Sequence, residues 1–400
     1  MDPDQKEAII KRWQNFPKTF AREIEDEILP LTKSKNAIFL YGPRRAGKSV
    51  ISQRLLKKSE GTIRYLNFDD PALPAKLANQ DIEELCSDLS KGSTVVLDEV
   101  QNVDGWEKWV RATVDTVRFH LIVTGSSAKL LSSEFATTLA GRGIGFLILP
   151  LSYKEFRQHT ANKNFEDYLS LGGYPEVVLT QNKLEMEKLW DAYFDLAIVK
   201  DVINRYSVRD PQALRSLAVY LLTNSTKTIS FRSLKGALGI SFDAIRQYLD
   251  YLETAFLHFT VPFFAYSLKK SMEWPRKTYS WDLGLQSRIS RSFSPDIGRK
   301  TENAVAIELK RRNFETYYWK GEKGLEVDFI ARKGPEILPI NVSYTDKLAE
   351  RETKALEAFM EEHKLKYSLV LSKTKKSETI KTSGNGKINI KNIEDWLLHR

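Results

Sequence analysis

Residues 42–49 read GPRRAGKS, a full match to the pattern G-x-x-x-x-G-K-[ST], between the apolar run AIFLY and a helix-patterned stretch. Glycines allow backbone turns that point amide N–H groups at phosphate oxygens, and the start of a helix adds partial positive charge. A loop with this pattern binds phosphate only where it joins the end of a buried strand to the start of a helix. It therefore predicts an α/β fold with a phosphate-binding loop.

The chain up to about residue 150 repeats this alternation of strand and helix. The apolar runs expected to form strands are AIFLY, TIRYLNF, STVVLD, HLIVTG and GFLILP. Strands that alternate with helices favour a parallel sheet with helices on its faces.

The loop sequence also assigns roles to its side chains. Lys48 should reach the β- and γ-phosphates of ATP, and the Ser49 hydroxyl can bind Mg²⁺. The residues expected to line the ATP site are Gly42, Pro43, Arg44, Arg45, Ala46, Gly47, Lys48, Ser49 and Val50.

Two carboxylates follow the run TVVL, at the point where its strand should end. We expect Asp98 to hold Mg²⁺ through water and Glu99 to polarise the attacking water. The strand HLIVTGSS ends in polar residues, so that Thr124 or Ser126 could sense the γ-phosphate between these carboxylates and the loop. Ordinary turn chemistry also explains such residues.

Arg142 precedes the last of these strands, in LAGRG. An arginine there could reach the γ-phosphate of a neighbouring subunit, which would make the protein a homo-oligomer. It could also simply face solvent.

The second half has a different composition. Residues from about 152 to 208 have helical patterning, with a sharp GGYPE turn at 172–176. Further on, Ser230 and Ser241 are each expected to cap a helix, and Gly239 to end the first, as in a helix-turn-helix. The next stretch reads as a hairpin, or wing. The basic residues expected near its tip are Lys269, Lys270, Arg276 and Lys277.

Charge is concentrated in this region. The chain carries a net charge of +9, and residues 211–300 hold thirteen basic side chains against six acidic ones. We expect DNA contacts here, through the basic wing and through Arg246 and Gln247 on the second helix. Acidic residues on the same helix repel phosphate, winged helices also dock proteins, and a basic excess can serve solubility alone.

Composition excludes several classes of protein. Apolar residues make up 42% of the chain, which is enough for packed cores, and its single cysteine, Cys86, excludes an intramolecular disulfide and a thiolate zinc site. No run is long and apolar enough for a membrane span, and the first residues lack a signal-peptide pattern. These features predict a cytoplasmic protein.

The ordered set GPRRAGKS, VVLDEVQ, VTGSSAKLL, LAGRG, LPLSYKEF and GGYPEVV resembles archaeal and bacterial AAA-type ATPases that carry a C-terminal domain of unknown function. The resemblance implies four parts: an AAA+ core over residues 1–150, a helical lid over 151–209, a winged helix-turn-helix over 210–297, and a restriction-endonuclease-like α/β domain over 298–400.

The last of these parts departs from an active nuclease. In active relatives the final strand carries Glu-x-Lys, whereas this chain has Asn341 and Ser343 there, with Glu302 and Asp328 retained. An amide is a weak ligand for a hard cation, and serine cannot act as lysine does. We expect a degenerate nuclease site. The polar tail from Lys373 to Lys387 is expected to be a flexible connection.

Together these features predict an Mg²⁺-dependent ATPase that couples ATP binding and hydrolysis to DNA binding or remodelling. One alternative is a slow nucleotide-dependent switch that binds a protein partner. An ATP-regulated nuclease fits the residues less well.

Overall fold

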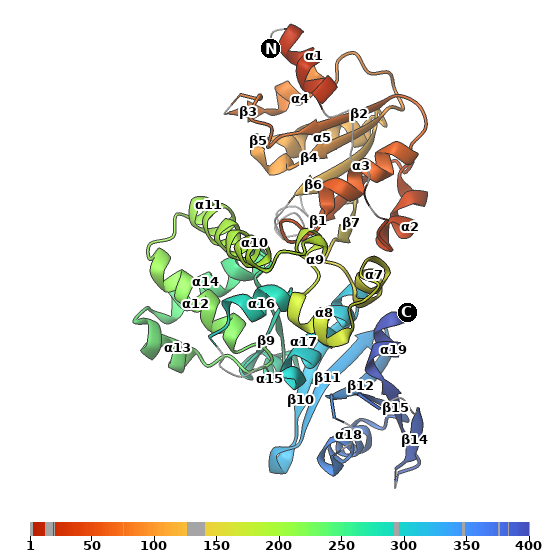
Figure 1. Cartoon of the computed structure of the whole chain (residues 1–400), viewed down its shortest axis with the longest axis vertical. Helices are drawn as coiled ribbons and strands as arrows, with labels where there is room; N and C mark the ends of the chain where they lie inside the picture. Colours follow the sequence, from red (N-terminus) through yellow and green to blue (C-terminus); the bar gives the residue numbers. More distant parts are fainter. Residues whose placement is uncertain are drawn as a thin grey trace. The chain divides into compact units, whose positions relative to one another are not determined.

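The computed structural model describes residues 3–12, 19, 21–74, 76–125, 141–291, 296–345, 349–374, 377–382 and 384–399. The chain divides into two compact units, Met1–Leu149 and Pro150–Arg400, each with its own core (Figure 1).

The first unit is built on a five-stranded sheet in the order β2-β4-β6-β1-β7, in which every neighbouring pair is parallel. Its strands are β1 (Ala37–Tyr41), β2 (Ile63–Asn67), β4 (Thr94–Asp98), β6 (His120–Gly125) and β7 (Gly143–Leu147). They coincide with the five apolar runs of the sequence, so the expected parallel sheet is confirmed.

Helices cover both faces of this sheet. The helices are α1 (Pro3–Arg12), α2 (Ile24–Ile28), α3 (Lys48–Lys58), α4 (Asn79–Leu85) and α5 (Trp106–Asp115), and short segments are η1 (Leu29–Leu31), β3 (Leu77–Ala78), η2 (Val100–Asn102) and β5 (Val103–Asp104). Val95 packs in the core that contains α4 and α5, whereas its neighbour Val96 packs in the core that contains α3. This alternation follows from the two-residue period of a strand.

The second unit begins with helices around an aromatic and aliphatic core that includes Trp190 and Phe194. The elements are α7 (Tyr153–His159), α8 (Phe165–Leu171), α9 (Pro175–Leu179), α10 (Lys183–Leu196), the π-helix η4 (Ala197–Ile203) and α11 (Asn204–Tyr206). Next come α12 (Pro211–Thr223), α13 (Phe231–Leu238), α14 (Phe242–Thr254), β8 (His258–Val261), α15 (Leu268–Glu273), β9 (Lys277–Ser280) and α16 (Leu283–Ile289).

Local sequence signals set where α13 and α14 begin and where α13 ends. The Ser230 hydroxyl accepts a hydrogen bond from Ser233 N, the Ser241 hydroxyl accepts one from Ala244 N, and Gly239 ends α13 with φ = 66°. The expected caps are therefore confirmed. The predicted simple hairpin after α14 is wrong in one respect, because α15 lies between β8 and β9.

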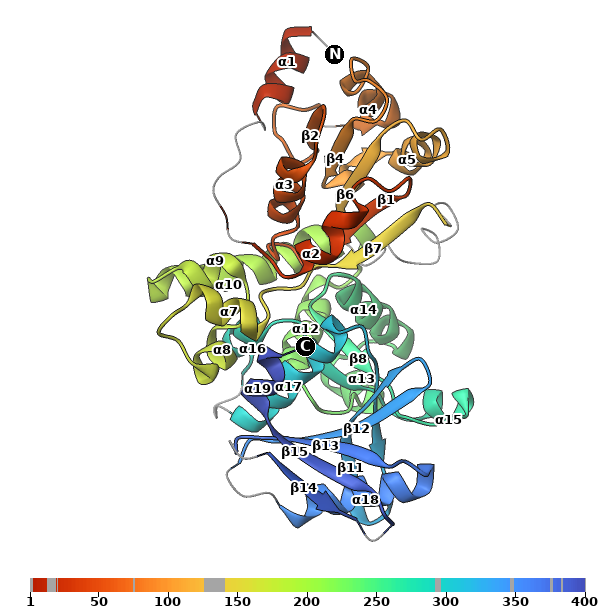
Figure 2. The same cartoon turned by 90° about the vertical axis from the view of Figure 1, so that its right-hand side faces the viewer.

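The unit ends in a six-stranded mixed sheet in the order β10-β11-β12-β13-β15-β14 (Figure 2). Its elements are α17 (Ile297–Arg311), β10 (Glu315–Lys320), η5 (Glu322–Gly324), β11 (Glu326–Lys333), β12 (Glu336–Ser343), α18 (Glu350–His363), β13 (Tyr367–Ser372), β14 (Glu378–Lys381), β15 (Lys387–Asn392) and α19 (Ile393–Leu398). Part of the tail expected to be a flexible connection instead forms β14, which pairs antiparallel with β15. Alternation in a short polar strand is too weak to detect from sequence, and pairing with β15 supplies its order.

In the described part of the chain, no helix is both long and apolar enough to cross a membrane.

Candidate active site

The phosphate-binding loop joins the end of β1 to the start of α3. Gly42 has φ = 149°, and a Cβ there would lie 2.1 Å from the carbonyl oxygen of Ile148. Gly47 precedes α3 with φ = 100°. Larger residues at these two positions would be strained or would collide with the neighbouring strand segment, so both glycines of the pattern have a structural cause.

Two buried cations hold the interior of this loop. Lys48 Nζ donates to Gly42 O at 3.0 Å and to Pro43 O at 2.8 Å. Arg22, which precedes α2, donates to Ala46 O at 2.9 Å and to Leu149 O at 2.8 Å. Arg22 was missed by the sequence analysis, because it lies outside the motif and nothing local distinguishes it from other arginines.

Asp98 is the centre of the polar cluster at the carboxyl ends of the strands. Its Oδ1 accepts from Ser49 Oγ at 3.0 Å and from Thr124 Oγ1, and its Oδ2 accepts from the Tyr65 hydroxyl. Strand β4 lies between β2 and β6, so Tyr65 and Thr124 reach Asp98 from either side. Burial, and then the charge of Glu99, raise the pKa of Asp98.

Thr124 therefore lies where the sequence analysis expected a polar side chain, between the carboxylates and the loop. Tyr65 was missed. It lies inside the run TIRYLNF, where an aromatic residue reads as core, and only the pairing of β2 with β4 brings its hydroxyl to the aspartate.

Glu99 adopts a left-handed backbone conformation with φ = 55°. Such a conformation is uncommon for a residue with a side chain, and it clusters at functional sites. Its N–H donates to Thr124 Oγ1 at 3.1 Å, its carboxylate accepts from Gln101 Nε2, and Arg44 Nη1 lies 3.7 Å from its Oε2. The turn separates Glu99 from Asp98, so the two adjacent carboxylates have different partners.

Arg142 lies beside the amino end of β1, as shown by the hydrogen bond from Ala37 N to its carbonyl. The phosphate-binding loop follows the other end of that strand. The Arg142 guanidinium pairs with Asp115, with Nε 2.6 Å from Oδ1. Ser126, the second sensor candidate, lies outside the described residues.

The second unit contains another charge cluster, which we call the Lys277 cluster and define as Lys277, Glu302, Glu326 and Asp328. Lys277 was placed near an exposed hairpin tip by the sequence analysis, and this placement is wrong. Lys277 lies in β9, is 3% exposed and forms ion pairs with all three carboxylates. All four residues of β9 are buried, so no alternation of polar and apolar residues marks Lys277 in the sequence as a buried side chain.

Asn341 and Ser343 do not contribute a charge to this cluster. Asn341 Oδ1 accepts from Asp328 N at 3.0 Å, and its Nδ2 donates to Glu352 Oε2 at 3.1 Å. Ser343 Oγ pairs with Thr345 Oγ1. The amide thus holds the backbone of β11 and the start of α18, as a structural residue does.

The other residues expected to meet DNA lie at the surface. Arg246 and Gln247 are exposed on α14, and Arg246 lies 3.9 Å from Asp243. Three further basic side chains are exposed on or beside α15: Lys269, Lys270 and Arg276.

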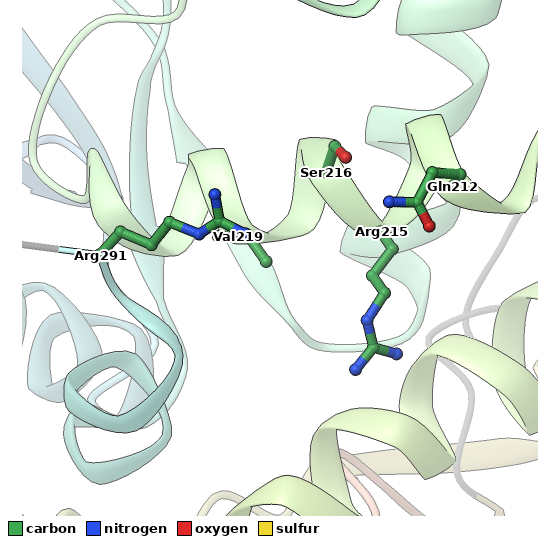
Figure 3. Close-up of a pocket in the computed structure, with 5 residues that line it drawn as sticks. All are labelled: Gln212, Arg215, Ser216, Val219 and Arg291. Atoms are coloured by element: carbon green, nitrogen blue, oxygen red, sulfur yellow. The ribbon is translucent and has the colours of Figure 1, made fainter.

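The second unit also has two surface pockets, of which only the second includes an expected site residue, Gln247. One, of about 240 Å³, is lined along α12 by Gln212, Arg215, Ser216 and Val219, with Arg291 beside them (Figure 3). The other, of about 470 Å³, lies at the start of α14. Gln247 and the stacked rings of Tyr206 and Tyr251, 4.0 Å apart, line it.

Comparison with known proteins gives three consecutive family matches. Residues 34–157 match an AAA domain, residues 162–296 match a domain of unknown function (DUF8612), and residues 297–393 match another (DUF4143).

Relatives match along nearly the whole chain. An uncharacterized protein of Methanocaldococcus jannaschii is 32% identical over 376 residues, which span 87% of this chain and 83% of that protein. An uncharacterized protein of Haemophilus influenzae is 30% identical over 400 residues, which span 94% of this chain and 98% of that protein. Among solved structures, a Walker-type ATPase of Pyrococcus abyssi is similar with 15% identity and a TM-score of 0.48, over 68% of this chain and 96% of that one. The chain belongs to the family of AAA-type P-loop ATPases in which the AAA domain is followed by these two domains of unknown function.

Proposed function

We propose that the first unit binds ATP with Mg²⁺ and hydrolyses it, and that the second unit couples the nucleotide state to contact with DNA. The observation that carries the ATPase assignment is the environment of Asp98. Its carboxylate accepts hydrogen bonds from Ser49 of the loop and from Thr124 of β6. These hydrogen bonds bring together the phosphate-binding loop, the acidic end of β4 and the polar end of β6. A P-loop ATPase needs these three elements side by side.

The side chains present fit this chemistry. Ser49 Oγ and Asp98 Oδ1 lie 3.0 Å apart, and a hydroxyl and a carboxylate are oxygen ligands that suit Mg²⁺. Bound Mg²⁺ would supply positive charge that offsets the charge developing on the transferred phosphoryl group. Lys48 and the amides at the start of α3 hold the phosphates, and Glu99 orients the attacking water.

Arg142 serves this reaction only between subunits. It lies beside the amino end of β1, away from the loop of its own chain. In a homo-oligomer it would contact the γ-phosphate bound to a neighbour, after leaving Asp115. Mixing Arg142→Ala protein with Glu99→Gln protein should then restore part of the turnover, because some interfaces combine an intact arginine with an intact glutamate. Turnover strictly proportional to the concentration of a monomer would contradict this role.

The side chains that we propose to contact DNA are exposed, and most of them are basic. We treat α12 to α14 with β8 and β9 as a winged helix, in which α14 presents Arg246 and Gln247 to solvent. Lys269 and Lys270 are exposed on α15. These side chains suit contacts with phosphates and base edges.

The test is the rate of ATP hydrolysis without DNA and with single-stranded, duplex or branched DNA. We expect stimulation by at least one form, and its loss when Lys269 and Lys270 are both replaced by Ala. Lys91→Ala, which removes an exposed lysine of the first unit, is the matched control and should leave stimulation unchanged. Turnover that ignores every form of DNA would contradict this coupling.

One observation favours a protein partner as the second candidate. Tyr266 and Leu268 are each 74% exposed, and Met272 on α15 is 68% exposed. Exposed apolar side chains grouped on one short segment are typical of docking sites. A slow nucleotide-dependent switch would use this segment, and its turnover would be indifferent to DNA.

We further propose that the second unit does not cut DNA. Strand β12 contributes neither a carboxylate nor a lysine to the cluster that contains Glu302 and Asp328, because Asn341 and Ser343 occupy those positions. We expect no cleavage of linear, supercoiled or branched DNA with Mg²⁺ or Mn²⁺, with or without ATP.

A further inference from the structure

Three segments that are far apart in the sequence converge on one ammonium group. Lys277 Nζ, from β9, lies 2.6 Å from Glu326 Oε1, 3.2 Å from Glu302 Oε1 and 3.9 Å from Asp328 Oδ1. Glu302 comes from α17, while Glu326 and Asp328 are two residues apart on β11 and so project from the same face of that strand. Tyr279, also on β9, donates to Glu302 Oε1 at 2.8 Å.

The electrostatics make this ammonium a fixed part of the site. Burial disfavours the charged form of Lys277, but Glu302, Asp328 and Glu326 outweigh it and raise the pKa of this lysine. Burial, and then Glu302, raise the pKa of Asp328. Taking one member of such a set away leaves buried charges without compensation, which is costly.

An ammonium surrounded by carboxylate oxygens occupies the kind of position that a hard divalent cation takes. In the described part of the chain, no three acidic, histidine or cysteine side chains are arranged to hold a metal ion. Here the carboxylates converge on Lys277 instead. Lys320 Nζ adds a second cation, 3.2 Å from Glu326 Oε2.

We propose that Lys277 takes the place of a divalent cation in this cluster, so that the carboxylates become a divalent-cation site only when its ammonium is removed. The cation is supplied by β9, which precedes the domain that supplies the carboxylates. The inference is independent of ATP hydrolysis, because all four residues lie in the second unit.

This arrangement also fixes the β8–β9 segment to the C-terminal sheet. Phe264 N donates to Tyr318 O at 2.7 Å, and Tyr318 N donates to Pro262 O at 3.0 Å. Asn303 of α17 accepts from Ser280 N at 2.8 Å and donates back to Ser280 O at 2.9 Å. These contacts flank Lys277, so backbone pairing on one side and the side chain of Asn303 on the other hold its ammonium at the cluster.

The experiment is Mn²⁺ binding to the full chain without nucleotide, followed by electron paramagnetic resonance of free Mn²⁺. Lys277→Ala removes the ammonium and leaves the space that it occupied open to an ion. We expect this variant to bind about one ion per chain more than the wild type, as a cluster of three carboxylates should. The added site should disappear when Asp328→Asn is combined with it.

Lys310→Ala is the matched control, because Lys310 is a partly buried lysine of α17 outside the cluster. It should add no site. A folded Lys277→Ala variant that binds no more Mn²⁺ than the wild type would overturn the proposal. Should that variant fail to fold, Asp328→Asn alone decides the matter. Equal binding by this variant and the wild type supports a site closed by Lys277, and weaker binding by the variant overturns it.

Discussion

The two units hold the carboxylates of their polar clusters in different ways. In the first unit, Asp98 accepts from the neutral hydroxyls of Ser49, Thr124 and Tyr65. In the second, Glu302 and Glu326 are paired with the ammonium of Lys277. Hydroxyl groups can exchange one acceptor for another at little cost, whereas a buried ion pair is costly to break. The first arrangement suits a site that receives a charged ligand, and the second suits a structural connection.

A third carboxylate, that of Asp282, is held by backbone amides. Asp282 is buried and accepts from Gly173 N at 2.7 Å and from Leu285 N at 2.8 Å. A Cβ on Gly172 would lie 2.4 Å from its Oδ1, and a Cβ on Gly173 would lie 2.4 Å from Leu151 O, so each glycine of the GGYPE turn has a structural cause. Backbone amides thus hold this carboxylate without a cation.

The largest effect should come from Lys48→Ala. The loop would lose the only lysine in GPRRAGKS, so we expect ATP binding to collapse and turnover to fall below about a tenth of the wild-type rate. Nucleotide binding and steady-state hydrolysis measure both quantities. Lys91→Ala should change neither, and a Lys48→Ala protein with near-normal turnover would show that the first cluster is not an ATP site.

Glu99→Gln should separate binding from chemistry. The amide keeps the shape of the side chain but cannot polarise water as a carboxylate does, so turnover should fall by about 10²–10⁴-fold. ATP affinity should stay near the wild-type value. The same acid-to-amide change at Glu302 should leave turnover unaffected, because that carboxylate belongs to the Lys277 cluster. Equal losses in the two variants would remove the distinction between the clusters.

Asp282→Asn should reveal a pH-dependent stability. Burial raises the pKa of Asp282 to about 6, so the folded chain binds this proton more tightly than the unfolded chain does. The resulting stabilisation is complete at acid pH and is lost as pH rises through about 6. It amounts to about 3 kcal/mol at most, taking the ordinary aspartate pKa as reference.

The measurement is urea unfolding of both proteins from pH 4.5 to 7.5. The cost of Asp282→Asn should shrink as the pH rises, since the asparagine variant does not titrate. A cost that grows over this range would mean that the backbone amides, and not burial, dominate this carboxylate.

Tyr65→Phe should produce the smallest effect. Loss of one hydrogen bond to Asp98 Oδ2 costs about 1 kcal/mol, so we expect turnover or Mg²⁺ affinity to weaken by less than about tenfold. Titrating Mg²⁺ at saturating ATP separates a shift in metal affinity from a lower maximal rate. Tyr317→Phe, which removes a hydroxyl from β10, is the control. An unchanged Mg²⁺ dependence in Tyr65→Phe would show that Ser49 and Thr124 alone orient Asp98.

The sequence by itself determined the features that depend on residues close together along the chain. The loop pattern specified Gly42 and Gly47, apolar runs specified the five strands of the first sheet, and Ser230 and Ser241 specified where two helices begin. Backbone conformation, side-chain period and capping act over a few residues, so they can be read locally.

Only the tertiary structure decided which distant side chains meet. Tyr65 reaches Asp98 because β2 and β4 are neighbours in the sheet. Arg22 reaches the phosphate-binding loop because the fold places the segment before α2 next to that loop. Lys277 was assigned to a surface tip until β9 placed it among carboxylates of α17 and β11. A charged side chain looks the same in sequence whether it meets solvent or an opposite charge, because burial and pairing depend on packing between segments that sequence spacing does not relate.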